Sequence, residues 1–262
     1  MTTEAETEPE RGKRRHQRTL FNDVAELYDE TRPEYPGDLI EFVVTTAGVG
    51  AGAAVLDVGC GTGQLTEALV PFGFSIAAID IGPSMVAVAR DRLAGTGVSF
   101  QVTSFEDFAA PDASFDLIVS GAAFHWIDPE IRFVKAARLL RPGGWLAVLG
   151  YDERYDEPLG TSLENMWRAR ANTAGAWVTR HPDTEAFADS GLFAAAVRQT
   201  HAVRMTRSAA DVIGVENTRA TSLSWPDSER REFNAQLRQH LRLWQDQVPL
   251  TLESAVTMAR TR

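Results

Sequence analysis

The stretch Ala53-Ala-Val-Leu-Asp-Val-Gly-Cys-Gly-Thr-Gly63 decides the fold of this chain. Its apolar residues predict a short buried strand, and Gly59, Gly61 and Gly63 predict a tight turn into a helix that begins at Gln64. Glycine carries no side chain, so at the carboxyl end of a parallel strand it lets a ligand lie against the peptide groups. The stretch therefore predicts a ligand site at the edge of a parallel sheet.

The spacing of the glycines indicates the kind of ligand. A dinucleotide fingerprint follows Gly-x-Gly-x-x-Gly, with the pyrophosphate on the N-terminus of the helix. This chain reads Asp-x-Gly-x-Gly-x-Gly, and Asp57 stands two residues before the first glycine. A carboxylate there repels phosphate but attracts an ammonium group or a ribose. A second carboxylate, Asp80, ends the next predicted strand and can accept both hydroxyls of a ribose. The pattern favours a nucleoside cofactor less anionic than a dinucleotide.

Three segments resemble the first, second and fourth motifs of the class I S-adenosylmethionine-dependent methyltransferases. They are Val55-Leu-Asp-Val-Gly-Cys-Gly-Thr-Gly-Gln64, Ala78-Ile-Asp-Ile-Gly-Pro-Ser-Met-Val-Ala87 and Ser114-Phe-Asp-Leu-Ile-Val-Ser120. Three motifs in the right order are a far more specific signal than a single glycine-rich turn. The resemblance implies that S-adenosylmethionine is the cofactor and that its methyl group passes to a small organic acceptor.

The resemblance also assigns roles to residues of these motifs. Asp80 would hold the ribose, and Ile81 would cover one face of the adenine ring. The first motif would hold the methionine part of the cofactor, with Asp57 on the side of its ammonium group. The cofactor-binding residues predicted in that motif are Asp57, Gly59, Cys60, Gly61 and Gly63.

The loop after the third predicted strand departs from the family pattern. In the family an acidic and a small residue contact the adenine edge there, and the matching positions in this chain are Ser104 and Phe105. We predict that both bind the cofactor. A hydroxyl oxygen nevertheless accepts a hydrogen bond from the adenine amino group more weakly than a carboxylate does. Glu106 and Asp107, which follow, are expected to form a solvated edge of the loop.

A segment before the first motif resembles the entry segment of one subgroup, the methyltransferases grouped with the ubiquinone/menaquinone C-methyltransferases and the trans-aconitate methyltransferases. It reads Phe21-x-x-x-Ala25-x-x-Tyr28-Asp29-x-x-Arg32-Pro33-x-Tyr35-Pro36. In that subgroup the segment folds over the cofactor and helps to close the active site. The resemblance implies a catalytic role for Tyr28, near the methionine end or the substrate, and carboxylate binding by Arg32. The alternative is a core tyrosine and a solvated arginine.

A histidine follows the fourth predicted strand, in Gly121-Ala-Ala-Phe-His-Trp-Ile-Asp-Pro129. This loop leaves the carboxyl end of the strand, where the resemblance puts the methyl group of the cofactor. We predict that His125 is catalytic, because an imidazole whose pKa is near neutrality can take a proton from a hydroxyl, an amine or an acidic carbon. It could instead position the acceptor, or tie the loop to the backbone.

Alternating strands and helices predict a doubly wound, Rossmann-like α/β fold. We expect a seven-stranded, mostly parallel sheet with an antiparallel last strand and a helical lid. Residues 1–18 are charged and almost without apolar side chains, which predicts a flexible tail. The other expected regions are a cofactor-binding core with N-terminal cover helices over 19–150, a lid over 151–191, and the end of the sheet with inserted helices over 192–262.

Composition narrows the class of partner. The chain is 44% hydrophobic and 24% charged, which is ordinary for a soluble globular protein, and its formal net charge of −10 argues against nucleic acid as a partner. A single cysteine, Cys60, excludes an internal disulfide and a cysteine metal cluster, and we predict no metal site. Without a run of 18 apolar residues or an apolar signal core, we expect a cytoplasmic protein that has no membrane partner. The oligomeric state is not indicated.

Two other functions stay open at this point. A nicotinamide-dependent oxidoreductase would need the third glycine one residue later and a proton donor such as Tyr-x-x-x-Lys. Tyr151 is followed by Tyr155 instead, and no lysine lies beyond Lys135. A non-catalytic S-adenosylmethionine-binding protein would keep the nucleoside site and fill the acceptor pocket. The motifs do not indicate whether carbon, oxygen or nitrogen is methylated.

Overall fold

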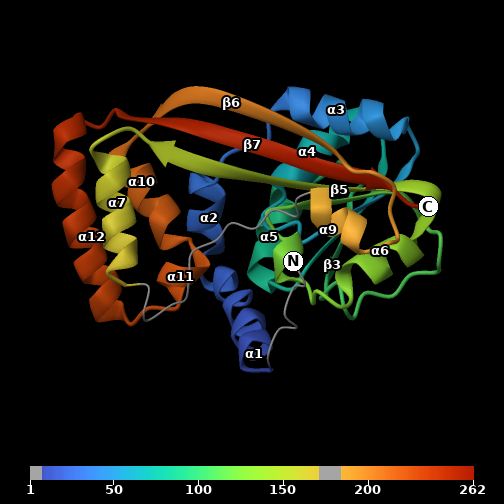
Figure 1. Ribbon diagram of the computed structural model, residues 1–262, viewed down its shortest axis with the longest axis horizontal. Helices are drawn as coiled ribbons and strands as arrows, with labels where there is room; N and C mark the ends of the chain where they lie inside the picture. The colour runs from blue at the N-terminus through green and yellow to red at the C-terminus, as the bar shows by residue number, and fades with distance from the viewer. Residues whose placement is uncertain (1–7, 171–183) are drawn as a thin grey trace.

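The computed structural model describes residues 8–170 and 184–262. Its centre is a seven-stranded sheet in the order β3-β2-β1-β4-β5-β7-β6 (Figure 1). The strands are β1 (Ala54–Val58), β2 (Ser75–Asp80), β3 (Ser99–Val102), β4 (Phe115–Gly121), β5 (Leu140–Tyr155), β6 (Val197–Arg207) and β7 (Val248–Arg260). Neighbouring strands among β1 to β5 pair in parallel, whereas β7 is antiparallel to both β5 and β6. The predicted fold class is confirmed, the antiparallel last strand included.

Helices cover both faces of the sheet. Helices α3 (Gly37–Ala47) and α4 (Gln64–Leu69) pack on one face, and α6 (Arg132–Leu139) and α9 (Thr184–Asp189) pack on the other. Helix α5 (Pro83–Arg92) follows β2 and buries Met85 and Val86. Successive side chains of a strand point to opposite faces. In β1, Val55 therefore joins the apolar cluster of α3 and α4, and Leu56 joins that of α6.

Strands β5, β6 and β7 extend beyond the core and carry a second group of helices at their far ends (Figure 1). These helices are α7 (Leu159–Arg168), α10 (Ala209–Asn217), α11 (Ala220–Leu223) and α12 (Asp227–Leu241), and the 3₁₀ helix η4 (Arg242–Trp244) follows them. Trp225, Phe233 and Leu250 are central to the apolar cluster that joins them to the strands. The predicted lid over 151–191 therefore begins as strand, because β5 continues to pair with β7 as far as Tyr155. Residues 171–183 of that lid lie outside the described residues.

The N-terminal region is more ordered than expected for a tail. Residues 1–7 lie outside the described part, but Glu8–Gln17 form helix α1, followed by the 3₁₀ helix η1 (Leu20–Val24) and helix α2 (Ala25–Thr31). Arg14 Nη1 of α1 donates a hydrogen bond to the backbone oxygen of Trp126 at 2.7 Å. The side chain of Arg14 is only 10% exposed, so Arg14 packs on the core, whereas Lys13 and Arg15 of the same run stay exposed.

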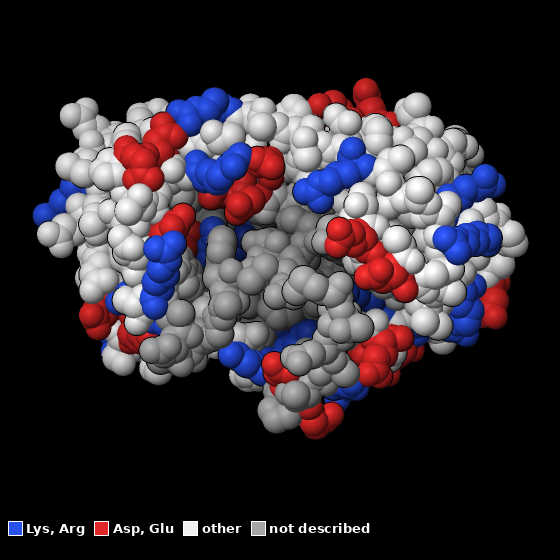
Figure 2. Space-filling model, viewed as in Figure 1, with Lys and Arg blue, Asp and Glu red and all other residues white. Residues whose placement is uncertain are grey.

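Acidic and basic side chains alternate over the face of the molecule shown in Figure 2. On that face the described residues form no extended patch of one sign. None of the described helices combines the length and the apolar character needed to span a membrane.

Candidate functional site

The glycine turn (residues 59–63) joins β1 to α4 at the carboxyl end of the parallel strands. Gly59, Gly61 and Gly63 have φ values of +72°, +55° and +97°, in the left-handed region that favours glycine. A Cβ atom at Gly59 would also overlap that of Ala123, in the loop after β4. Glycine is therefore required both by the backbone conformation and by the close approach of two loops.

Asp80 ends β2 beside this turn. Its Oδ2 accepts a hydrogen bond from the backbone N–H of Gly61 at 3.0 Å, and its Oδ1 accepts one from Gly82 at 2.8 Å. Burial raises the pKa of Asp80, and these backbone N–H groups partly oppose the rise. The carboxylate thus holds the turn in place from the neighbouring strand.

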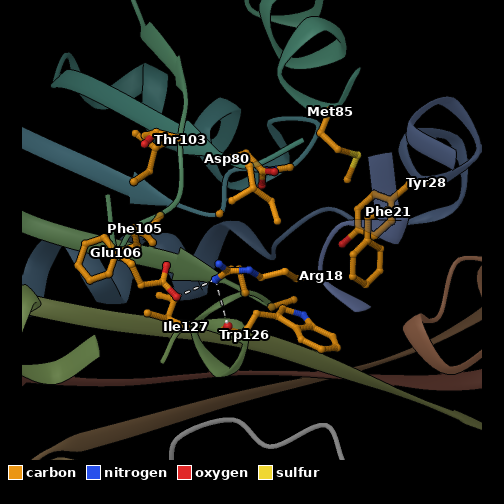
Figure 3. Close-up of a pocket in the computed structure, with 18 residues that line it drawn as sticks. Arg18, Phe21, Tyr28, Asp80, Met85, Thr103, Phe105, Glu106, Trp126 and Ile127 are labelled. Atoms are coloured by element: carbon orange, nitrogen blue, oxygen red, sulfur yellow. Dashed lines mark hydrogen bonds and ion pairs between the residues drawn. The ribbon is translucent and has the colours of Figure 1, made fainter. Parts of the chain in front are cut away.

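Two adjoining cavities open along the glycine turn. The larger cavity lies among residues of the turn, β2, α5 and the loops after β3 and β4 (Figure 3). The smaller cavity lies between the turn and the residues that follow α2. Tyr28, Gly59, Gly61 and Gly121 line both cavities. A single elongated ligand can therefore lie across the turn with one end in each cavity.

The larger cavity has mainly apolar walls. On one side Phe21 meets Tyr28 and Trp126 edge to face, with ring centroids 5.8 Å and 5.9 Å apart. Asp80 and Phe105 line other parts of the same cavity (Figure 3). Apolar walls with a few well-placed polar groups are typical of sites for aromatic small molecules.

The smaller cavity contains a buried cation. Arg32 donates from Nη2 to the backbone oxygen of Thr218 at 2.6 Å and from Nη1 to the Tyr151 hydroxyl at 3.3 Å. Its Nε is buried, and no described residue accepts a hydrogen bond from it. The guanidinium lies 4.8 Å from the ring centroid of Tyr28. Because a buried donor without an acceptor is costly, this cavity favours an anionic ligand group.

Tyr28 lies where the two cavities meet. Burial raises the pKa of the Tyr28 hydroxyl well above its usual range, and Tyr151 adds to the rise. The hydroxyl therefore keeps its proton near neutral pH. It can donate a hydrogen bond to a ligand but cannot serve as a general base.

The structure brings most of the predicted site residues together. The larger cavity is lined by Tyr28, Gly59, Gly61, Asp80, Ile81 and Phe105. The smaller cavity adds Arg32 and Cys60. Four predicted residues line neither cavity, and they are Asp57, Gly63, Ser104 and His125.

Two of these four residues, Asp57 and Gly63, stand in β1 just before the glycine turn and at the end of the turn. Asp57 is fully buried, and its Oδ2 accepts a hydrogen bond from the Thr66 hydroxyl at 2.6 Å. Its Oδ1 has no hydrogen-bond partner among the described residues, and burial raises the pKa of Asp57 to about 7. Gly63 stands at the start of α4, where a Cβ would press on Leu93 and Ala89 of the α5 region. The positive φ of Gly63 and this close packing, rather than ligand contact, account for glycine at this position.

The other two residues belong to loops beside the larger cavity. The Ser104 hydroxyl donates to Asp107 Oδ2 at 2.6 Å and accepts from the Asp107 N–H at 3.0 Å, which closes a tight turn. His125 lies in the 3₁₀ helix η3 (Phe124–Trp126), is half-buried, and has its ring centroid 4.8 Å from that of Trp126.

The sequence reasoning missed several residues of the cavity walls. Glu106, expected on a solvated edge, has only 16% of its side chain exposed, lines the larger cavity and forms an ion pair with Arg18 at 2.7 Å. Arg18 comes from the predicted tail, 88 residues away along the chain. Other wall residues not singled out for the site are Thr103, Trp126 and Ile127 in the larger cavity, and Tyr35, Gln64 and Tyr151 in the smaller one.

Comparison with known proteins gives the family of this region. Residues 56–148, which include β1, the glycine turn, Asp80 and β4, match the family model described as a methyltransferase domain. This match covers about a third of the chain. The predicted resemblance to class I methyltransferases is thereby confirmed for the part of the chain that holds the glycine turn.

This chain and its curated relatives match over only part of their lengths. An uncharacterized methyltransferase from Mycobacterium tuberculosis is 37% identical over 147 residues, which are 56% of this chain and 57% of the relative. A ubiquinone biosynthesis O-methyltransferase from Xanthomonas axonopodis pv. citri is 44% identical over 100 residues, 37% of this chain and 42% of the relative. The chain thus spans about half the length of the curated relatives it matches.

Solved structures extend the likeness in fold. A protein from Anaeromyxobacter dehalogenans, assigned as a type II methyltransferase, has a TM-score of 0.66 at 22% identity and covers 87% of this chain and 97% of its own. A phosphoethanolamine N-methyltransferase 2 from Haemonchus contortus, solved with phosphomonomethylethanolamine and S-adenosylhomocysteine, has a TM-score of 0.54 at 16% identity. That match covers 92% of this chain and 59% of the Haemonchus chain. The core and the extended strands on either side of residues 56–148 thus share one fold with these proteins.

Proposed function

We propose that this chain transfers a methyl group from S-adenosylmethionine to a small organic acceptor. The observation that carries the proposal is the pair of cavities that meet at the glycine turn of a methyltransferase domain. One cavity is mainly apolar and holds a carboxylate, and the other holds a buried guanidinium with an unused donor. An adenosine and an amino-acid group, joined through a sulfonium, match these two environments.

The larger cavity suits the adenosine part. Asp80 and Ile81 line this cavity, where Asp80 would accept ribose hydroxyls and Ile81 would cover one face of the adenine ring. The loop that holds Ser104 and Phe105 borders the same cavity and would lie along the adenine edge. These residues would hold the nucleoside by its sugar and its ring, and the carboxylate beside the turn disfavours the phosphates of a dinucleotide.

The smaller cavity suits the amino-acid part. Arg32 Nε would donate to the carboxylate of the cofactor, and the glycine turn with Cys60 leaves room for the methionine chain. Asp57, buried behind the turn, would act on the ammonium group through its charge, without direct contact. A cation and an anion on opposite sides match a zwitterionic ligand.

S-adenosylmethionine supplies an electrophilic methyl group, which an acceptor takes by in-line displacement. The residues of this chain would contribute proximity and a water-poor pocket, since such a transfer needs little acid–base chemistry when the acceptor is already nucleophilic. Tyr28 would donate a hydrogen bond where the cavities meet. His125 would take a proton from the acceptor, or would hold the acceptor in place.

Two observations support a small molecule as acceptor. Several curated relatives are named for ubiquinone biosynthesis, in which they are O-methyltransferases. Acidic and basic side chains also alternate on the face shown in Figure 2, unlike the basic stripe typical of nucleic-acid-binding proteins. The acceptor atom stays open among oxygen, carbon and nitrogen, so an acceptor screen should include hydroxyls, acidic carbons and amines.

Calorimetric titration of the purified chain with S-adenosylhomocysteine tests the cofactor assignment, with NADH as the control ligand. We expect micromolar binding of S-adenosylhomocysteine and no heat with NADH. Binding of NADH alone would instead favour the oxidoreductase. Binding of S-adenosylhomocysteine without methyl transfer to any acceptor class would favour a non-catalytic S-adenosylmethionine-binding protein.

His125→Ala separates catalysis from cofactor binding. His125 lines neither cavity. Because a substitution away from the ligand changes its affinity little, we expect S-adenosylhomocysteine affinity to stay within about threefold of the wild type. With an acceptor found in the screen, transfer should slow by at least about tenfold, because a positioned base or anchor is lost. Unchanged transfer would assign His125 to the loop structure alone.

A further inference from the structure

Glu106 reaches into the larger cavity from the loop after β3 (Figure 3). Its Oε1 accepts a hydrogen bond from Arg18 Nη1 at 2.7 Å. Its Oε2 is buried, and no described residue donates a hydrogen bond to it. A buried carboxylate oxygen without a donor is unfavourable, so a ligand that brings an N–H group to this oxygen is stabilised there.

The loop that carries Glu106 is fixed by its surroundings. Lys135 Nζ, from α6, donates to the backbone oxygens of Glu106 at 2.8 Å and Phe108 at 2.6 Å. The same ammonium lies 5.5 Å from the ring centroid of Phe105. Because these contacts come from the protein itself, Glu106 is held in place before a ligand arrives.

Arg18 neutralises the Glu106 carboxylate at the cavity wall. The Arg18 side chain is 17% exposed and also lies 3.5 Å, through Nη1, from the backbone oxygen of Trp126. The pair places a hydrogen-bond acceptor in the cavity without adding net charge. Such an acceptor suits a neutral nucleobase that carries an amino group.

Ser104, at the position where the resemblance expects the adenine-contacting acid, is engaged elsewhere. Its hydroxyl exchanges hydrogen bonds with Asp107, and Ser104 does not line the larger cavity. Phe105 and Glu106 both do. The acceptor facing this part of the cavity is thus two residues further along the chain than the resemblance implies.

We propose that Glu106 accepts a hydrogen bond from the amino group of the adenine, and that Arg18 holds the Glu106 carboxylate in position. The inference rests on the proposed function and names the residue that makes the cofactor site selective for adenine. A hypoxanthine ring has a carbonyl oxygen in place of the amino group. That oxygen would face the carboxylate oxygen of Glu106, which gives the site a repulsive element against the wrong base.

The test compares S-adenosylhomocysteine with S-inosylhomocysteine by calorimetric titration. We expect the wild type to bind the adenosyl ligand at least about tenfold more tightly. In Glu106→Gln the amide can donate to the hypoxanthine oxygen, so the two affinities should fall within about threefold of each other. Asp107→Asn, which removes a neighbouring carboxylate, is the matched control and should keep the wild-type ratio. Arg18→Met should lower the ratio of the two affinities, because the Glu106 carboxylate loses the contact that holds it in position.

The ratio of the two affinities separates this role from a structural one, since a damaged loop weakens both ligands alike. If Glu106→Gln keeps the wild-type ratio of affinities for the adenosyl and inosyl ligands, the inference is overturned. If the ratio instead falls to about one in Ser104→Ala, Ser104 would be the residue that accepts the hydrogen bond from the adenine amino group. If the wild type binds neither ligand, the proposed function itself fails, and that result is distinct from a failure of the assignment to Glu106.

Discussion

Asp80→Ala is expected to weaken S-adenosylhomocysteine binding by about 100-fold or more, as measured by calorimetric titration. Two ribose hydroxyls would donate to this carboxylate, and a hydrogen bond to a charged group contributes about 1.5–3 kcal/mol. Loss of both corresponds to about 3–6 kcal/mol, which is at least about 100-fold in affinity. The Gly61 N–H also loses its acceptor, so the glycine turn is less well fixed for the rest of the ligand.

Two further variants make this result specific. Asp91→Ala removes an exposed carboxylate from α5 and should bind within about twofold of the wild type, as expected for an unconnected surface site. Asp80→Asn keeps the shape of the side chain and should show an intermediate loss. Thermal unfolding of each variant reports whether the fold is intact. A folded Asp80→Ala protein with wild-type affinity would contradict the ribose assignment and weaken the case for this cofactor.

The elements predicted most accurately are those whose sequence pattern lies within one short segment. The apolar run before Gly59 predicts β1, the glycines predict a turn that only a residue without a side chain can form, and Asp80 follows β2 at the sheet edge. A parallel sheet brings the carboxyl ends of these strands together. The fold class alone therefore predicts that these residues, far apart in the sequence, lie close together. The core of the site is predictable for this reason.

The features that were missed depend on contacts between distant segments. Glu106 looks like one acid in a polar loop, but it pairs with Arg18 and accepts a hydrogen bond from the Asp128 N–H, and both partners are distant in the sequence. Arg14 and Arg18 form part of a charge run that predicts a solvated tail. In the structure, however, the Trp126 backbone oxygen and distant carboxylates bind these two side chains. Residues 151–155 are polar enough for a loop, yet backbone pairing with β7 makes them strand. Composition describes each segment alone, whereas burial here is decided by its neighbours.

Asp57→Asn is expected to change how stability depends on pH. Burial raises the pKa of Asp57 from its ordinary value of 3.8 to about 7 in the folded chain. Between these two values the unfolded chain has lost the proton that the folded chain retains, so the free energy of unfolding falls as pH rises from about 4 to about 7. The difference between the two pKa values corresponds to a loss on the order of 4 kcal/mol across this window. Chemical unfolding at several pH values should show this slope in the wild type and its loss in Asp57→Asn.

Comparison of slopes is informative even if the amide packs less well, because a constant loss of stability moves the whole curve and leaves its slope unchanged. Asp23→Asn, at an exposed carboxylate, is the control and should follow the wild-type slope. An ammonium group near the turn favours the ionised carboxylate, so S-adenosylhomocysteine should bind more tightly as pH rises through about 7 and should release a proton. Titrations near pH 7 in buffers with different heats of ionisation measure that proton directly. Equal proton release by wild type and Asp57→Asn would show that Asp57 does not sense the ammonium group, and its raised pKa would then describe burial alone.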